Sequence, residues 1–388
     1  MPALGGLVML IGVPKEIKNR ENRVGLTPES VQELITAGHQ VLVETHAGQG
    51  INATDEDYTQ VGASIAASAS EVFAHAEMIV KVKEPQAEER AMLREGQLLF
   101  TYLHLAPDAE QTKDLVASGA TCIAYETITS ASGGLPLLAP MSEVAGRMSI
   151  QAGSHALEKT KGGRGMLLGG VPGVAPAKVV VIGGGVVGSN AVQMAVGARA
   201  DVVVLDRSKQ ALVNIDQEFG GAVKTVYSTK AALEQHVSEA DLVIGSVLIP
   251  GAKAPKLVTA EMVANMKKGA VLVDVAIDQG GCFATSRATT HEQPTYEVDG
   301  VVHYCVANMP GGVPLTSTYA LNNATLPYVM KLANKGWRMA LAEDKHFLAG
   351  LNVHAGQVTN AYVAEALGYA YMDPALACDE TAKVEEVA

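Results

Sequence analysis

Four ionisable side chains stand where strand-like segments end, and their types suit chemistry on a small acid. His104 closes the strand-like run in FTYLHLAP, and Lys83 precedes the Glu-Pro pair that stops the run MIVKVK. Arg23 lies in a loop between the first strand-like segment and a helix, and Asp278 follows the run AVLVDVA. Because open α/β sheets bind ligands outside the carboxyl ends of their strands, these four residues are predicted to face one ligand.

Each of the four groups has a chemical role that it can fill in such a site. A guanidinium such as that of Arg23 holds a carboxylate through two parallel hydrogen bonds. The ammonium of Lys83 can hydrogen-bond a carbonyl or carboxylate oxygen and stabilise charge there. A histidine such as His104 can move the proton that accompanies hydride transfer or water addition. Asp278 can stabilise a developing iminium charge or share the proton transfer, so the set predicts oxidation of a 2-amino or 2-hydroxy acid.

Taken singly, these residues have plainer interpretations. A histidine such as His104, on a buried strand, is often a core residue that is hydrogen-bonded to backbone. Lys83 and Arg23 are each consistent with a solvated surface charge. The joint position of all four at strand ends favours a site, with three groups from the first half of the chain and Asp278 from the second. This distribution predicts a cleft between two domains.

A glycine-rich turn marks a nucleotide site. KVVVIGGGVVG places Gly183, Gly185 and Gly188 in the G-x-G-x-x-G pattern, directly after a strand and at the start of a helix. Such glycines allow a tight turn and a close approach of the pyrophosphate, which meets the unpaired N–H groups of the helix. Asp206 closes the next strand, where an acid can bind the ribose hydroxyls of NAD and repel the 2′-phosphate of NADP. NAD is the expected cofactor, although Arg207 leaves NADP open; the alternative is a turn that binds nothing.

Strand-like and helix-like runs alternate along the chain, as in βαβ units. The first series has strands at 7–13, 40–45, 78–83, 97–105 and 122–126, with helices at 27–37, 56–62, 70–76 and 108–118. A helix at 141–159 and a glycine-rich connection lead to strands at 178–182, 201–206, 223–227, 241–246, 270–276 and 301–307. After Pro310 the pattern is helical to the end. The expected fold class is α/β, with two doubly wound domains, a Rossmann-type NAD-binding domain and a substrate domain, and an interdomain cleft.

Composition and charge exclude several classes of protein. The 388 residues are 48% hydrophobic, 18% charged and 4% aromatic, as expected for parallel strands that helices cover on both faces. The net charge of −12 argues against a nucleic-acid partner and provides no basic patch for a membrane surface. The longest apolar stretch, residues 179–198, contains the glycine turn and two side-chain amides, so it is a poor membrane span.

The cysteines and the first residues point to a cytoplasmic protein. The four cysteines form no CxxC pair and no zinc spacing, so reduced thiols and no metal are expected; they are Cys122, Cys282, Cys305 and Cys378. The start of the chain lacks the basic region and the length of a signal peptide. Met9 can be the natural start, which would make the residues before it an extension.

Several unusual motifs follow one another along the chain. They are GVPKEIKNRENRVGLTP, KVKEP, FTYLHLAP, LLAPMSEVAGR, GGVPGV, IDQGGCF and CVANMPGGVP. Together they resemble the NAD-dependent L-alanine dehydrogenases, from about Gly12 to about Ala366. The resemblance implies reversible oxidative deamination of L-alanine to pyruvate and ammonia with NAD, in a homohexamer of two-domain subunits. It also implies a substrate domain of residues 1–136 plus 315–388 and an NAD-binding domain of residues 137–314.

The resemblance further implies roles for individual residues. Arg23 and Lys83 match the substrate-binding pair of the family, and His104 and Asp278 match its catalytic pair, with the proton assignment between these two left open. The implied cofactor contacts are Ser142, Gly183, Gly185, Val186, Gly188, Asp206, Ser228, Val247, Leu248, Ile277, Asp278, Arg287, Val306, Ala307, Asn308 and Met309. One position departs from the family, because Ala211 stands where some members have a lysine, which puts one cofactor contact in doubt.

Three other functions remain as alternatives. The first is the NAD(H)-binding component of a proton-translocating transhydrogenase, which has no amino-acid substrate and carries an asparagine-alanine pair where this chain has Lys83-Glu84. The second is a related 2-amino acid dehydrogenase such as a lysine-forming saccharopine dehydrogenase. The third is an NAD-dependent scaffold or storage protein, for which the reactive side chains at the strand ends would have no purpose.

Overall fold

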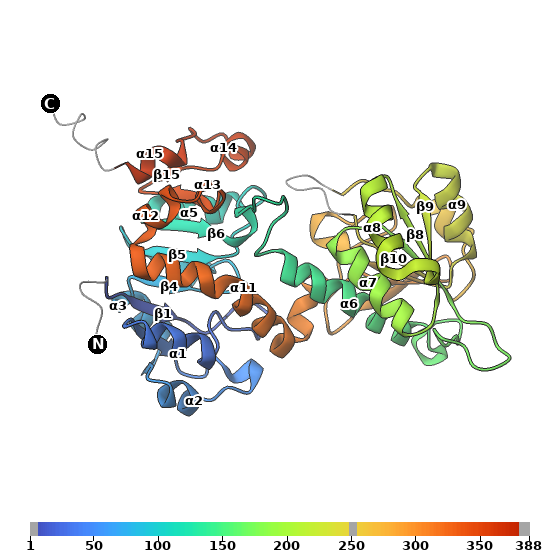
Figure 1. Cartoon of the computed structure of the whole chain (residues 1–388), viewed down its shortest axis with the longest axis horizontal. Coiled ribbons are helices and arrows are strands. Elements are labelled where there is room, and N and C mark those ends of the chain that lie inside the picture. The colour runs from blue at the N-terminus through green and yellow to red at the C-terminus, as the bar shows by residue number, and fades with distance from the viewer. Residues whose placement is uncertain (1–6, 248–253, 380–388) are drawn as a thin grey trace. The chain divides into compact units, whose positions relative to one another are not determined.

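The computed structural model describes residues 7–247 and 254–379, and the chain divides into two compact units (Figure 1). The first unit comprises residues 1–141 and 313–388, and the second comprises residues 142–312. Each unit is built on one sheet of mainly parallel strands joined by helices. The expectation of two α/β domains is therefore confirmed.

The sheet of the first unit has, within the described residues, eight strands in the order β15-β14-β6-β5-β4-β1-β2-β3. Their bounds are β1 Leu10–Val13, β2 Gln40–Glu44, β3 Ser64–Ala66, β4 Met78–Val80, β5 Leu98–Thr101, β6 Thr121–Ala124, β14 Leu351–His354 and β15 Gln357–Val358. Strands β1 to β6 pair in parallel, whereas β14 is antiparallel to β6 and β15 is antiparallel to β14. Every residue of β4, β5 and β6 is buried, as expected when both faces of a sheet are covered.

Helices join these strands, and side-chain caps begin several of them. They are α1 Pro28–Thr36, α2 Asp55–Gln60, α3 Ala69–His75, α4 Ala87–Arg90, α5 Ala109–Ser118, α11 Pro314–Lys335, α12 Trp337–Ala342, α13 Lys345–Leu348, α14 Ala361–Leu367 and α15 Pro374–Cys378. Thr27 caps α1 by accepting the Ser30 N–H, and proline stands at the first helical position, so the predicted start of this helix is confirmed. Short 3-10 turns lie at Gln49–Ile51 and Tyr125–Thr127.

The sheet of the second unit has, in the described part of the chain, seven strands in the order β12-β13-β11-β10-β7-β8-β9. They are β7 Lys178–Ile182, β8 Asp201–Asp206, β9 Val223–Tyr227, β10 Leu242–Gly245, β11 Val271–Asp274, β12 Thr295–Val298 and β13 Val301–Tyr304. The antiparallel strand β12 forms one edge. The helices are α6 Ala139–Ala156, α7 Val186–Gly197, α8 Lys209–Phe219, α9 Lys230–Glu239 and α10 Ala260–Ala264, and 3-10 turns lie at Lys159–Lys161, Gly220–Ala222, Val275–Gln279 and Met309–Gly312.

Helices cover both faces of the second sheet, and strand β7 shows this directly. Val179 and Val181 belong to the hydrophobic cluster on one face, and Val180 and Ile182 belong to the cluster on the other. Because successive side chains of a strand point to opposite faces, a run without polar residues must be buried on both. The apolar runs of the sequence therefore predicted this doubly wound arrangement correctly.

Two strands end earlier than their sequence pattern predicts, and the difference moves site residues off the sheet. Lys83 and His104 lie in the loops after β4 and β5 rather than on the strands themselves. Beyond each strand, a glutamate carboxylate accepts backbone N–H groups: Glu16 does so after β4 and Glu126 after β5. The prediction that Lys83 and His104 are the last residues of strands is therefore wrong.

The expectation that the chain is helical from Pro310 to its end is also wrong in part. Strands β14 and β15 interrupt the helices, and Val353 of β14 pairs with Cys122 of β6. This pairing joins residues far apart in the sequence, so no local pattern specifies it. The short elements β3, β12 and α4 were likewise not predicted.

Candidate active site

Strand order reverses at one point in each sheet, and the candidate residues follow the strands at these points. In the first sheet, β2 and β3 lie on one side of β1, and β4, β5 and β6 lie on the other. In the second sheet, β8 and β9 lie on one side of β7, and β10, β11 and β13 lie on the other. Arg23, Lys83 and His104 follow the neighbouring strands β1, β4 and β5, and we call them the first-unit site. Ligands of open α/β sheets bind beside such reversals.

Arg23 is a buried cation, not the solvated surface charge that its loop position allowed. Its side chain is 2% exposed. Nε donates to Oε1 of Glu21 at 2.6 Å, Nη2 donates to Oε2 at 2.5 Å, and Nη1 lies 3.0 Å from Sδ of Met141. Burial alone would lower the pKa of Arg23, but the hydrogen bond and charge of Glu21 outweigh it and raise the pKa. The guanidinium is therefore fixed in position and charged.

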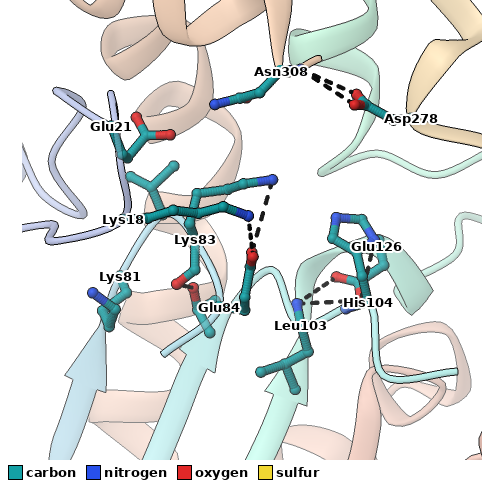
Figure 2. A network of polar contacts seen from close by, with 12 residues as sticks. Lys18, Glu21, Lys81, Lys83, Glu84, Leu103, His104, Glu126, Asp278 and Asn308 are labelled. Carbon is teal, nitrogen blue, oxygen red and sulfur yellow. Dashed lines mark hydrogen bonds and ion pairs between the residues drawn. The ribbon is translucent and has the colours of Figure 1, made fainter. Parts of the chain in front are cut away.

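Lys83 lies among charged groups after β4 (Figure 2). Its side chain is 14% exposed, and Nζ is 3.8 Å from Oε2 of Glu84. The other oxygen of Glu84 pairs with Lys18. Burial would raise the pKa of Glu84, but the two ammonium groups outweigh burial and lower it. The backbone of Lys83 is also fixed, since its carbonyl accepts the Thr101 hydroxyl at 2.9 Å.

A buried ion cluster anchors the segment that carries Lys83. Lys81 Nζ donates to Oε1 of Glu89 at 2.6 Å and to Oε2 of Glu16 at 3.1 Å, and all three side chains are at most 2% exposed. The remaining oxygen of Glu16 accepts the N–H of Val82 at 2.6 Å and that of Lys83 at 3.3 Å. Burial would lower the pKa of Lys81, but the two carboxylates outweigh burial and raise it. The cluster therefore positions the backbone from which Lys83 projects.

A cavity of about 390 Å³ opens beside Arg23 within the first unit. Its lining is mostly polar and comprises Lys15, Glu16, Glu21, Asn22, Arg23, His46, Ala47, Gln49 and Gly50. Cavities of this size hold small molecules.

His104 is exposed, so the interpretation as a core histidine does not hold. Its side chain is 45% exposed, and its φ of +52° is a left-handed conformation in the loop after β5. Oε1 of Glu126 accepts the His104 N–H at 2.6 Å and lies 3.9 Å from Nδ1 (Figure 2). Both carboxylate oxygens also accept the N–H of Leu103. Tyr102 stacks on the imidazole with ring centroids 5.8 Å apart, which orients the ring.

The glycine turn of the second unit has the geometry that its sequence predicts. Gly183 has a φ of +105°, and a Cβ on Gly188 would lie 1.8 Å from the carbonyl oxygen of Gly183. Both positions therefore require glycine. Gly185 is the N-cap of α7 and has no side chain there, so the first N–H groups of the helix face outward without a side-chain cap. Such a cradle fits a pyrophosphate.

Asp206 ends β8 with its carboxylate against this turn. Oδ2 accepts the N–H of Gly184 at 2.6 Å, and Oδ1 accepts that of Ser208 at 2.6 Å. The N–H of Ser228 donates to the Asp206 carbonyl at 2.9 Å, which brings the ends of β8 and β9 together. Asp206 therefore lies at the end of β8, where the sequence predicts an acid that binds the ribose hydroxyls.

Asp278 lies in the 3-10 turn after β11, with an exposed side chain. The N–H of Asn308 is 3.3 and 3.4 Å from its two carboxylate oxygens (Figure 2). Asn308 itself has a φ of +55° in the segment before α11. The structure thus brings the aspartate predicted to be catalytic next to one of the residues predicted to contact the cofactor.

The remaining cofactor candidates are spread over the second unit. Val186 is exposed at the start of α7, and Arg287 stacks on Tyr296 with its Cζ 4.1 Å from the ring centroid. Leu248 lies outside the described residues. The others are Ser142 on α6, Val247 after β10, Ile277 beside Asp278, and Val306, Ala307 and Met309 after β13.

Four carboxylates that sequence reasoning did not single out hold these residues in place. Glu21 binds Arg23, Glu16 binds the backbone of Lys83, Glu126 binds that of His104, and Asp274 binds the loop of Asp278. Glu16, Glu126 and Asp274 lie at or just after a strand end, which is the one signal that the sequence offered for them. Among the described residues, no cluster of histidine, cysteine or acidic side chains could hold a metal ion, and no helix is long and apolar enough to cross a membrane.

Comparison with known proteins identifies the family. The models of the alanine dehydrogenase/PNT N-terminal and C-terminal domains match residues 12–145 and 149–361. The chain belongs to the alanine dehydrogenase/PNT family. It is 62% identical to an alanine dehydrogenase of Halomonas elongata over 95% of this chain and 99% of that protein.

Solved structures of the family agree with the fold. An L-alanine dehydrogenase matches with a TM-score of 0.90 and 54% identity over 93% of this chain and 99% of that one. A transhydrogenase from Sinorhizobium meliloti matches with a TM-score of 0.80 and 26% identity over 90% of this chain and 100% of that one. The alanine dehydrogenase branch of the family is therefore the nearer of these two.

Proposed function

We propose that this chain catalyses the reversible NAD-dependent oxidative deamination of L-alanine to pyruvate and ammonia. One observation carries the proposal. A chain so similar to alanine dehydrogenases presents Arg23, Lys83 and His104 after three neighbouring parallel strands of one sheet. These are the groups that binding and proton transfer on a 2-amino acid require.

The second unit fits NAD. The turn at Gly183 and Gly188 is a cradle that a side chain would fill, and Asp206 stands at the end of the next strand. A carboxylate at that place repels the 2′-phosphate of NADP, so NAD is the cofactor. When bound, NAD accepts the hydride from the substrate. We infer that the second unit is the NAD-binding domain and the first is the substrate domain.

The residues of the chain bind the substrate and move its protons. Glu21 holds the guanidinium of Arg23 in place, and the positive charge of Arg23 binds the substrate carboxylate. The ammonium of Lys83 stabilises negative charge on the carboxylate or the carbonyl oxygen. His104 or Asp278 accepts the proton of the amine or of the attacking water during deamination and returns it during amination.

Assembly and location complete the proposal. The subunit forms a homohexamer, acts in the cytoplasm and serves amino-acid catabolism. Its partners are the small molecules L-alanine, pyruvate and ammonia, with no nucleic acid and no membrane, in keeping with the net charge of −12.

Initial rates of NADH formation test the proposal. The purified protein is assayed with NAD and one of L-alanine, D-alanine, L-lactate, L-glutamate or saccharopine. We expect L-alanine to give the highest kcat/KM by at least about tenfold, because the chain is 62% identical to an alanine dehydrogenase. A preference for saccharopine would support the related dehydrogenase. Binding of NAD without turnover of any amino acid would support the transhydrogenase component.

A further inference from the structure

Asp274 has a buried carboxylate, and in the described part of the chain the groups that hydrogen-bond to it all belong to one loop. It is the last residue of β11, and it is 0% exposed. Oδ1 accepts the N–H of Ala276 at 3.1 Å and lies 3.6 Å from Sγ of Cys282. Oδ2 accepts the N–H of Cys282 at 2.9 Å, the N–H of Phe283 at 3.3 Å and the hydroxyl of Ser286 at 2.5 Å. These donors begin and end the loop of residues 275–287, which carries Asp278.

We propose that Asp274 is a positioning residue for the reaction, because it fixes the loop from which Asp278 projects. The inference rests on the proposed function, in which Asp278 takes part in proton transfer or stabilises the developing charge. Asp274 itself is too deeply buried to touch a substrate. It acts through the backbone of the loop.

The loop is folded closely around this carboxylate. Gly280 and Gly281 have φ values of +89° and +77°, and they turn the chain back after Asp278. A Cβ on Gly281 would lie 2.5 Å from Oδ2 of Asp274, so the backbone approaches as closely as glycine permits. The outer side of the same loop presents Asp278 to the Asn308 N–H. Backbone hydrogen bonds to residues 254–258 also hold this loop, and the carboxylate of Asp274 supplies the bonds on its inner side.

Another buried aspartate of the same sheet shows what a purely structural role looks like. Asp241 precedes β10 and is 2% exposed. It pairs with Arg164 at 3.1 Å and with Lys267 at 3.0 Å, and it accepts the Lys178 N–H at 2.8 Å. Its partners come from three separate segments, at the ends of the strands opposite to the candidate site. Asp274, in contrast, has among the described residues only partners from the loop that bears Asp278.

Asp274→Asn is the primary test. The amide keeps one acceptor oxygen but replaces the other with an NH₂ group, which must face N–H or O–H donors. We expect the loop to shift and kcat for reductive amination of pyruvate to fall about 10²-fold, as small misplacements of catalytic groups do. KM for pyruvate is expected to change by less than about threefold, because Arg23 and Lys83 lie outside this loop. A lower melting temperature of Asp274→Asn with an unchanged kcat would overturn the proposal.

Two further variants keep the test decisive. Asp241→Asn, at the matched buried position, is expected to lower the melting temperature and leave kcat unchanged. Ser286→Ala removes the 2.5 Å hydrogen bond to Asp274 without adding a donor, so it tests the same contact should Asp274→Asn fail to fold. We expect Ser286→Ala to lower kcat by about tenfold. Equal kcat in Ser286→Ala and Asp241→Asn would contradict the role of the loop.

A double-mutant cycle with Asp278→Asn separates this inference from the proposed function. If Asp274 acts through Asp278, adding Asp274→Asn or Ser286→Ala to Asp278→Asn lowers kcat little further, since groups that act as a unit are not additive. Effects that multiply would overturn the positioning role while leaving the proposed function intact. Normal kcat in Asp278→Asn alone would instead remove Asp278 from the proposed mechanism, and the positioning role with it.

Discussion

At the scale of single residues, the three groups of the first-unit site differ in how the protein holds them. Arg23 is buried and fixed by Glu21, whereas His104 is exposed in a left-handed backbone conformation with Glu126 on its amide. A left-handed conformation at an exposed histidine is consistent with a functional role. Tyr102 on one side of the ring restricts its motion.

His104→Gln tests whether the imidazole moves a proton. The amide can replace one hydrogen bond but cannot titrate, so kcat should fall by about 10²–10⁴. Since the side chain is exposed, the melting temperature and NADH binding should stay unchanged. His155→Gln is the matched control, because His155 is exposed and ion-paired with Glu158 at 3.2 Å in the second unit. Near-normal turnover in His104→Gln would assign the proton to Asp278 or Lys83.

At the scale of elements, the loops that carry the site are fixed by buried carboxylates. Lys81 illustrates the energetic consequence, because its ammonium compensates the buried charges of Glu16 and Glu89. Removing one partner of a buried ion pair leaves an uncompensated charge, which costs far more than removing an exposed pair.

Lys81→Met is therefore expected to destabilise the first unit by about 3–5 kcal/mol. The control Lys224→Met removes an exposed ammonium that lies 2.6 Å from Asp201, and it should cost less than about 1 kcal/mol. Urea denaturation of both variants measures the difference. Similar midpoints for Lys81→Met and the wild-type protein would show that the buried cluster contributes no net stability.

The sequence predicted those elements whose signals are local. The glycine turn, the cap at Thr27 and the apolar strands were found because spacing and residue type specify them within a few positions. The supports of the site were missed because they join distant residues: Glu16 bonds Val82, and Glu126 bonds His104. The pairing of β14 with β6 was missed for the same reason. The strand-like sequence patterns of β4 and β5 also continue beyond the residues at which these strands end. There the carboxylates of Glu16 and Glu126, and not a neighbouring strand, accept the backbone N–H groups.

At the scale of the whole molecule, the family predicts an assembly of six subunits. Analytical ultracentrifugation at micromolar concentration should show a particle of about six times the subunit mass of 40.4 kDa. A stable particle at the mass of one subunit would refute the proposed hexamer.

The transfer of deuterium from L-alanine labelled at Cα tests the central claim most directly. In oxidative deamination the hydrogen of Cα leaves as hydride to the nicotinamide, while nitrogen leaves as ammonia. The account predicts that the purified protein forms deuterated NADH, pyruvate and ammonium in equal amounts. Reduced cofactor without ammonium, unlabelled NADH from labelled L-alanine, or no reduction of NAD at all would contradict it.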